Sequence, residues 1–194
     1  MEKAGLVVSS AEPTADEALA VSSRPMDLAR ARSELKGLSL LGPRSDQLAI
    51  SADQVLEYAG QAYGKVSEAA EASRVLRLLS GHVHELHAAY SLILYPQGQT
   101  PQLLLSRVVT AKMRMRALSD AEIAAYVATE EWRGCAGCYQ YENRGVQLFE
   151  SVDGDLSTII GLPMPELLAD LRSLGINPLL SPAGPWQLSY GTRS

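Results

Sequence analysis

One apolar stretch decides the fold: residues 48–56 read Leu-Ala-Ile-Ser-Ala-Asp-Gln-Val-Leu. A run of this kind predicts a strand covered on both faces, like the inner strands of α/β sheets. Asp53 interrupts the run, and burying its carboxylate is costly unless a metal, a cation or water compensates the charge. Asp53 is therefore the first candidate for a functional residue, with Gln54 and Lys65 close to it in the sequence. The alternative is a strand-end aspartate that caps the following turn.

Helices and strands alternate on both sides of this stretch. Helical patterns begin at residues that favour the first turn of a helix, namely Pro25, Ser67, Ser119 (in a capping box with Glu122) and Pro163. We expect Gly37 to end the first of these helices. Strand-like patterns cover residues 6–10, 83–95, 103–115 and 146–149, and the middle two predict an antiparallel hairpin. This order indicates an α/β fold with a mixed sheet.

The composition excludes several classes of protein. The chain has 194 residues, enough for one domain or two small lobes, and a formal net charge of −5. A nucleic-acid coat or a membrane-surface protein needs a basic excess. No apolar stretch approaches the length of a spanning helix, so we expect a cytoplasmic protein with no membrane and no nucleic-acid partner. Cys135 and Cys138 form a lone C-x-x-C, half of a zinc site or a redox motif.

Two further patterns leave alternatives open. Lys112, Arg114 and Arg116 alternate with methionines at the end of the second hairpin strand, so they form either a solvated basic face or a wall that faces phosphate. His82 and His84 share one face of the first hairpin strand. They are either unremarkable strand residues or part of a metal site.

Six short motifs follow one another along the chain. They are Asp16-Glu17, Ser51-Ala52-Asp53-Gln54-Val55, Gly64-Lys65, Ala136-Gly137-Cys138-Tyr139-Gln140-Tyr141-Glu142, Gly154-Asp155 and Ile160-Gly161-Leu162-Pro163. Each motif alone is weak, but in this order and spacing they resemble the Maf-like nucleotide pyrophosphatases. The resemblance covers residues 1–179 as one Maf-like domain and leaves residues 180–194 as an expected flexible tail.

The resemblance implies an enzyme that hydrolyses nucleoside triphosphates to the monophosphate and pyrophosphate. It implies an elongated mixed β-sheet flanked by helices, with a central cleft between two lobes, and a divalent metal cation (Mg, Mn or Co) as cofactor. Asp53 matches the proposed proton acceptor, and Lys65 matches a lysine that contacts phosphate. Glu17 matches an acidic residue that holds the metal together with Asp53. These roles agree with the need for a base and for cations in phosphoanhydride hydrolysis.

Three positions bear on the substrate. Gln54 and Glu142 resemble the branch associated with 7-methyl-GTP rather than the branch associated with dTTP and UTP. The carboxylate of Glu142 can accept hydrogen bonds from the N1–H and the amine of a guanine-like base. Arg32 stands where the family usually has lysine and keeps the positive charge expected to bind substrate.

The chain departs from the family pattern at its start. Family members open with a strand and a Ser-x-Ser-x-x-Arg-Arg phosphate loop, and this sequence begins after that loop, with residues 1–5 resembling the last turn of a helix. We therefore expect an N-terminally shortened domain. A catalytically weak nucleotide-binding or regulatory protein is the alternative function. The resemblance leaves both a monomer and a homodimer open.

Overall fold

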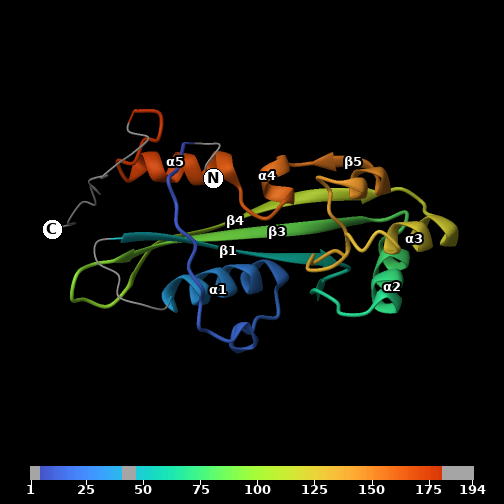
Figure 1. Cartoon of the computed structure of the whole chain (residues 1–194), viewed down its shortest axis with the longest axis horizontal. Helices are drawn as coiled ribbons and strands as arrows, with labels where there is room; N and C mark the ends of the chain where they lie inside the picture. Colours follow the sequence, from blue (N-terminus) through green and yellow to red (C-terminus); the bar gives the residue numbers. More distant parts are fainter. Residues whose placement is uncertain (1–4, 41–46, 181–194) are drawn as a thin grey trace.

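A five-stranded sheet runs along the molecule in the order β2-β1-β3-β4-β5 (Figure 1). The structure is a computed structural model that describes residues 5–40 and 47–180. Its strands are β1 Gln47–Tyr58, β2 Gln61–Tyr63, β3 Val83–Tyr95, β4 Gln102–Met115 and β5 Phe149–Asp153. Its helices are α1 Pro25–Leu38, α2 Ala69–Leu79, α3 Asp120–Val127, α4 Leu156–Ile159 and α5 Met164–Ser173, with short 3-10 segments at Glu17–Leu19 and Arg144–Leu148. Nearly all of the helical turn expected at residues 1–5, and nearly all of the expected tail, lie outside the described residues.

The predicted α/β class and the β3–β4 hairpin are confirmed, but each of the four described strand pairs is antiparallel, in place of the predicted mixed sheet. The connections explain this difference. Ala59 and Gly60, both with positive φ, turn the chain directly from β1 into β2. Helix α2 then carries the chain across so that β3 runs antiparallel to β1, with Asp53 opposite Ala89 and Glu57 opposite Glu85.

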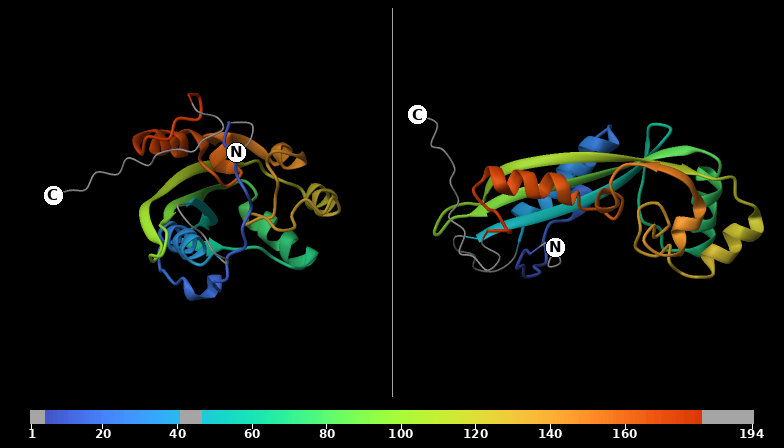
Figure 2. Two further views of the ribbon diagram at one scale, coloured as in Figure 1. Left: turned by 60° about the vertical axis from the view of Figure 1, so that its left-hand side comes forward. Right: turned by 90° about the horizontal axis from the view of Figure 1, so that it is seen from above.

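Helices cover both faces of the long strands. Helix α1 lies on one face, α4 and α5 lie on the other, and α2 and α3 pack at one end of the elongated molecule (Figures 1 and 2). The larger hydrophobic cluster lies at the α2–α3 end, around Leu56, Met113 and Trp132. A smaller one lies beneath α5, around Tyr90 and Leu167. A third, smaller cluster of Ala29, Val55 and Ala89 lies between α1 and the sheet.

Gly37 does not end helix α1, contrary to the prediction. The helix continues one residue further, to Leu38, and Gly37 faces the sheet at very short range. A Cβ atom at Gly37 would lie 2.2 Å from Cδ1 of Ile93 and 2.4 Å from Oγ of Ser51. The glycine is therefore needed for the close approach of α1 to β1 and β3.

The sequence signals for where elements begin were right for α3 and wrong for α2 and β5. Ser119 and Glu122 form the predicted capping box of α3. Ser67 does not cap α2, because the helix begins later and Glu68 occupies the N-cap position. The strand expected at residues 146–149 begins only at Phe149, because residues 144–148 form a 3-10 segment.

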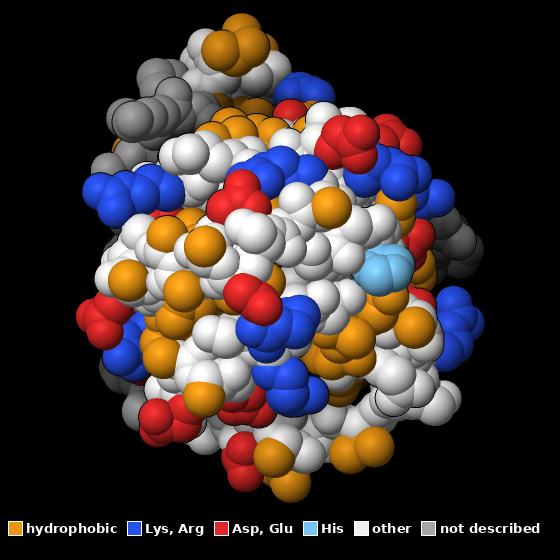
Figure 3. Space-filling model, turned by 90° about the vertical axis from the view of Figure 1, so that its right-hand side faces the viewer, with side chains coloured by type: hydrophobic (Ala, Val, Ile, Leu, Met, Phe, Trp, Pro, Cys, Tyr) orange, Lys and Arg blue, Asp and Glu red, His pale blue; other side chains and the backbone are white. Residues whose placement is uncertain are grey.

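The end of β4 has the predicted alternation, with Met113 and Met115 buried and Lys112 and Arg114 exposed. At the α2–α3 end of the molecule, Lys and Arg side chains are interspersed with Asp and Glu (Figure 3). This arrangement agrees with a solvated basic face rather than a wall that faces phosphate. Among the described residues, no helix has the length and apolar character needed to cross a membrane.

The two histidines at the start of β3 have different environments. His82 is exposed beside the ring of Tyr58, whereas His84 is buried and lies 2.8 Å from the hydroxyl of Tyr139. Burial lowers the pKa of His84 to about 4. The two side chains therefore do not form an accessible metal site.

We expect His84 to make the fold sensitive to acid. Because the pKa of His84 is about 4 in the folded state and near 6.5 in the unfolded chain, only the unfolded chain takes up this proton between those values. The free energy of unfolding therefore keeps its full value above pH 6.5 and falls by about 3 kcal/mol as the pH drops to 4. Urea unfolding at pH 7 and pH 4 measures this loss. The double variant His84→Phe/Tyr139→Phe should lose less; an equal loss in both proteins would contradict this role for His84.

Candidate active site

A cavity of about 280 Å³ lies beside the edge of β1. Strand β2 pairs with β1 only from Leu56 to Tyr58, so at Asp53 this edge carries no other strand within the described part of the chain. The loop of residues 134–142 and the end of α4 form the opposite walls. The cavity lining includes four of the residues predicted for the site, together with a lysine that was not predicted: Asp53, Gln54, Lys65, Glu142 and Lys36.

Asp53 is a buried carboxylate with one paired oxygen and one unpaired oxygen. Its Oδ1 lies 2.5 Å from Nζ of Lys36, and only 8% of the side chain is exposed. Its Oδ2 is buried and has no hydrogen-bond partner among the described residues. Burial raises the pKa of Asp53, although the charges of Lys36 and Arg32 oppose the rise. The free oxygen of a carboxyl group with a raised pKa is suited to accept a proton.

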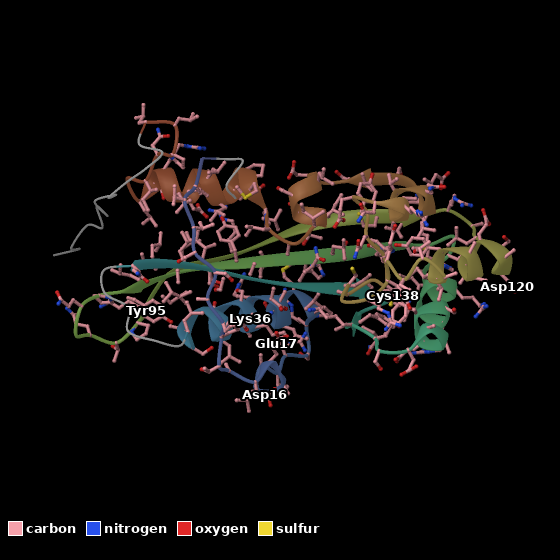
Figure 4. The ribbon with its side chains drawn as sticks, in the orientation of Figure 1. Asp16, Glu17, Lys36, Tyr95, Asp120 and Cys138 are labelled. Carbon is pink, nitrogen blue, oxygen red and sulfur yellow. The ribbon has the colours of Figure 1, made fainter. Side chains whose placement is uncertain are left out.

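Lys36 connects Asp53 to Glu17. Its Nζ lies 2.9 Å from Oε1 of Glu17, which comes from the 3-10 segment beneath α1 (Figure 4). The hydrogen bond to Lys36 lowers the pKa of Glu17. Burial pulls the pKa of Lys36 down, but its hydrogen bonds to Asp53 and Glu17 and their charges outweigh burial and raise it. Lys36 therefore stays charged and holds the two carboxylates in place.

Lys36 is not among the residues predicted for the site, although the sequence contains one signal for it. Lys36 lies four residues after Arg32 on α1, so the two cations share one side of the helix. The structure places Arg32 outside the cavity lining, with a buried Nε that has no hydrogen-bond partner among the described residues. Its charge still lowers the pKa of both Glu17 and Asp53. Lys36, rather than Arg32, makes the direct contact with the acidic pair.

The remaining predicted residues lie on separate walls of the cavity. The side-chain amide of Gln54 donates hydrogen bonds to the carbonyl oxygens of Thr158 and Ile159, both at 3.0 Å. These bonds attach β1 to α4. Lys65 and Glu142 are exposed side chains of the cavity lining, one from the segment after β2 and one from the 134–142 loop. The cavity thus has acidic and basic groups within one concave surface.

Two carboxylate groups near the cavity have oxygen atoms of the kind that bind a hard divalent cation. The Oδ2 atom of Asp53 is a buried acceptor without a partner among the described residues. Glu17 contacts the same lysine, Lys36, and its side chain is 48% exposed. Carboxylate oxygens are the ligands that Mg²⁺ and Mn²⁺ prefer. Glu17 and Asp53 therefore have the ligand chemistry that such an ion requires.

The two cysteines do not have the environment of a redox pair. Cys138 is fully buried in the larger hydrophobic cluster, and Cys135 is partly buried in the cavity wall. Burial raises the pKa of both thiols, that of Cys138 to about 12. Because the thiolate is the reactive form, both groups are unreactive near neutral pH.

Comparison with known proteins gives one family and several relatives. A family model described as "Maf-like protein" matches residues 1–174. The chain is 38% identical over 158 residues to a "7-methyl-GTP pyrophosphatase" of Rhizobium meliloti (strain 1021), covering 80% of this chain and 77% of that protein. It is 39% identical over 155 residues to a "Nucleoside triphosphate pyrophosphatase" of Rhodopseudomonas palustris (strain BisB5), covering 78% of this chain and 73% of the relative.

Proposed function

The chain belongs to the Maf-like protein family, and on this premise we propose that it is a nucleotide pyrophosphatase, which hydrolyses nucleoside triphosphates to the monophosphate and pyrophosphate. The observation that carries the proposal is the cavity beside β1, which is lined by Asp53, Lys36 and Lys65 and in which Asp53 has one carboxylate oxygen without a partner among the described residues. Hydrolysis of a phosphoanhydride needs a base for the attacking water and cations for the departing pyrophosphate. The cavity contains both kinds of group.

In the proposed reaction, the carboxylate of Asp53 accepts a proton from the attacking water. Lys36 fixes the carboxylate through Oδ1, so the second oxygen keeps one orientation. Lys65, at the exposed side of the cavity, contacts the phosphate chain, and Arg32 adds positive charge behind the acidic pair. A divalent cation held by Glu17 and Asp53 would neutralise charge on the pyrophosphate as it departs.

The direct test is to incubate the purified chain with nucleoside triphosphates, including 7-methyl-GTP, in the presence of Mg²⁺, Mn²⁺ or Co²⁺. We expect equal amounts of pyrophosphate and nucleoside monophosphate. Release of inorganic phosphate alone would contradict cleavage between the α- and β-phosphates. Nucleotide binding without turnover would favour the alternative, a nucleotide-binding or regulatory protein.

We also propose a preference for guanine-like bases, which is tested with 7-methyl-GTP, the substrate in the name of the Rhizobium relative. Glu142 lines the cavity and is exposed to it, so its two oxygens are available to a base. Gln54 lines the same cavity. Its amide hydrogens already bond to α4, so it shapes the pocket through a fixed side chain.

Glu142→Gln should shift the preference away from guanine-like nucleotides. The change exchanges one acceptor for a donor, which then faces a base N–H; such a mismatch costs about 1 to 3 kcal/mol, or roughly ten- to a hundredfold in relative kcat/KM. Comparing 7-methyl-GTP with UTP in both proteins measures the shift. Glu150→Gln, an exposed position on β5 outside the cavity lining, is the matched control. An unchanged ratio in Glu142→Gln would mean that the base is recognised elsewhere.

The cytoplasmic location, the absence of membrane and nucleic-acid partners, and the choice between monomer and homodimer stay predictions. The nucleotide itself is the partner that the family relationship supports best.

A further inference from the structure

A second cluster of ligating side chains lies on the face of the sheet that carries Asp53. Glu57 is four residues beyond Asp53 on β1, so both side chains point to the same face, about 13 Å apart along the strand. Glu57 pairs with Glu85 on β3, and His87 is two residues further along that strand. One ligating atom from each of Glu57, Glu85 and His87 lies within 4.8 Å of the others.

A contact with the neighbouring strand β4 orients the ring of His87. Its side chain is 1% exposed, and its Nδ1 lies 2.9 Å from the hydroxyl of Thr110 on β4. This contact directs Nε2 toward the two carboxylates, at 2.8 Å from Oε2 of Glu57 and 3.8 Å from Oε2 of Glu85. A partner on the second ring nitrogen is the usual arrangement for a histidine that binds metal. The glutamate side chains are 28% and 35% exposed, so an ion can reach the cluster from solvent.

We propose that Glu57, Glu85 and His87 bind a divalent transition-metal ion such as Zn²⁺, at a site separate from the cavity that contains Asp53. One imidazole and two carboxylates suit Zn²⁺ or Co²⁺ better than Mg²⁺, which prefers oxygen ligands alone. Metal–ligand distances near 2.1 Å place tetrahedral ligand atoms about 3.4 Å apart. The observed 2.8 Å and 3.8 Å lie on either side of that value, so small side-chain movements close the site.

The bound ion would tie β1, the strand that carries Asp53, to β3. The proposal does not depend on the pyrophosphatase activity. One neighbouring charge opposes it: Nζ of Lys112 lies 3.8 Å from Oε1 of Glu85. Lys112 is 60% exposed and can move into solvent when an ion binds.

The test uses the full chain in an Asp53→Asn background, which weakens metal binding in the cavity. Zn²⁺ alone is titrated by calorimetry, and Co²⁺ is titrated by its visible absorption, which reports a nitrogen- and oxygen-bound ion of low coordination number. We expect one ion per chain and a higher thermal midpoint with Zn²⁺. A large excess of Mg²⁺ should displace neither Zn²⁺ nor Co²⁺. The absence of stoichiometric Zn²⁺ binding would overturn the proposal.

Variants locate the site. Glu57→Gln, at a partly exposed position that tolerates the change, and His87→Gln should each weaken Zn²⁺ binding at least tenfold. His82→Gln, which removes an exposed histidine just before β3, should leave binding unchanged. Lys112→Gln should strengthen binding about twofold, because it removes the competing cation. Equal Zn²⁺ affinity in the Glu57→Gln, His82→Gln and unsubstituted proteins would show that the ion binds elsewhere and would overturn the assignment.

Discussion

Asp53→Asn is expected to lower pyrophosphate release about 100- to 10,000-fold, the range that general-base catalysis supplies. The amide has nearly the shape of the carboxylate and still offers an oxygen to Lys36 in place of Oδ1. It cannot take a proton from water, however, and it is a poor ligand for a divalent cation. We therefore expect a folded protein that has lost its chemical step.

Pyrophosphate release at saturating nucleotide, together with the thermal midpoint, tests this expectation. The midpoint should change little, because the variant removes a carboxylate whose burial is itself unfavourable, as its raised pKa indicates. Asp120→Asn makes the same chemical change on the surface of α3, where Asp120 pairs with Arg77, and should retain full activity. Turnover at the unsubstituted rate in Asp53→Asn would remove Asp53 from the mechanism.

The strand that carries the site was predictable because its signal is local. The apolar run of residues 48–56 lies within β1, and Asp53 stands out in it as a buried charge. Lys65 and Glu142 were predicted from the family resemblance, and both line the cavity with Asp53. Order and spacing of short motifs therefore identified side chains that meet only in the folded chain.

Lys36 could not be predicted in the same way because its position depends on how α1 docks. The sequence suggested that Gly37 ends the helix, whereas the structure shows that Gly37 permits contact with Ser51 and Ile93. That contact places Lys36 over Asp53. The cluster at Glu57 and His87 likewise depends on strand register, which sequence periodicity alone does not specify.

Lys36→Met is expected to have the second-largest effect, a loss of activity of about tenfold to a hundredfold. Lys36 is 18% exposed and contacts both Asp53 and Glu17, so its removal leaves two neighbouring carboxylates without a shared cation. Breaking a buried ion pair costs about 3 to 5 kcal/mol, but Glu17 is 48% exposed, and solvent screening reduces the expected loss of stability to about 1 to 3 kcal/mol. The thermal midpoint should fall by several degrees.

The dependence on pH separates loss of charge from loss of packing. The pKa of Lys36 is raised from 10.5, so its contribution to stability is present at neutral pH and is lost only as the pH rises above that value. Lys36 also lowers the pKa of Asp53, so Lys36→Met should leave more Asp53 protonated at acidic pH. The deficit in kcat/KM relative to the unsubstituted protein should therefore be larger at pH 5 than at pH 8. Lys36→Arg, which keeps the charge, should recover most of the activity at both values. A deficit of equal size at pH 5 and pH 8, unrelieved by arginine, would show that Lys36 supports the site through its packing alone.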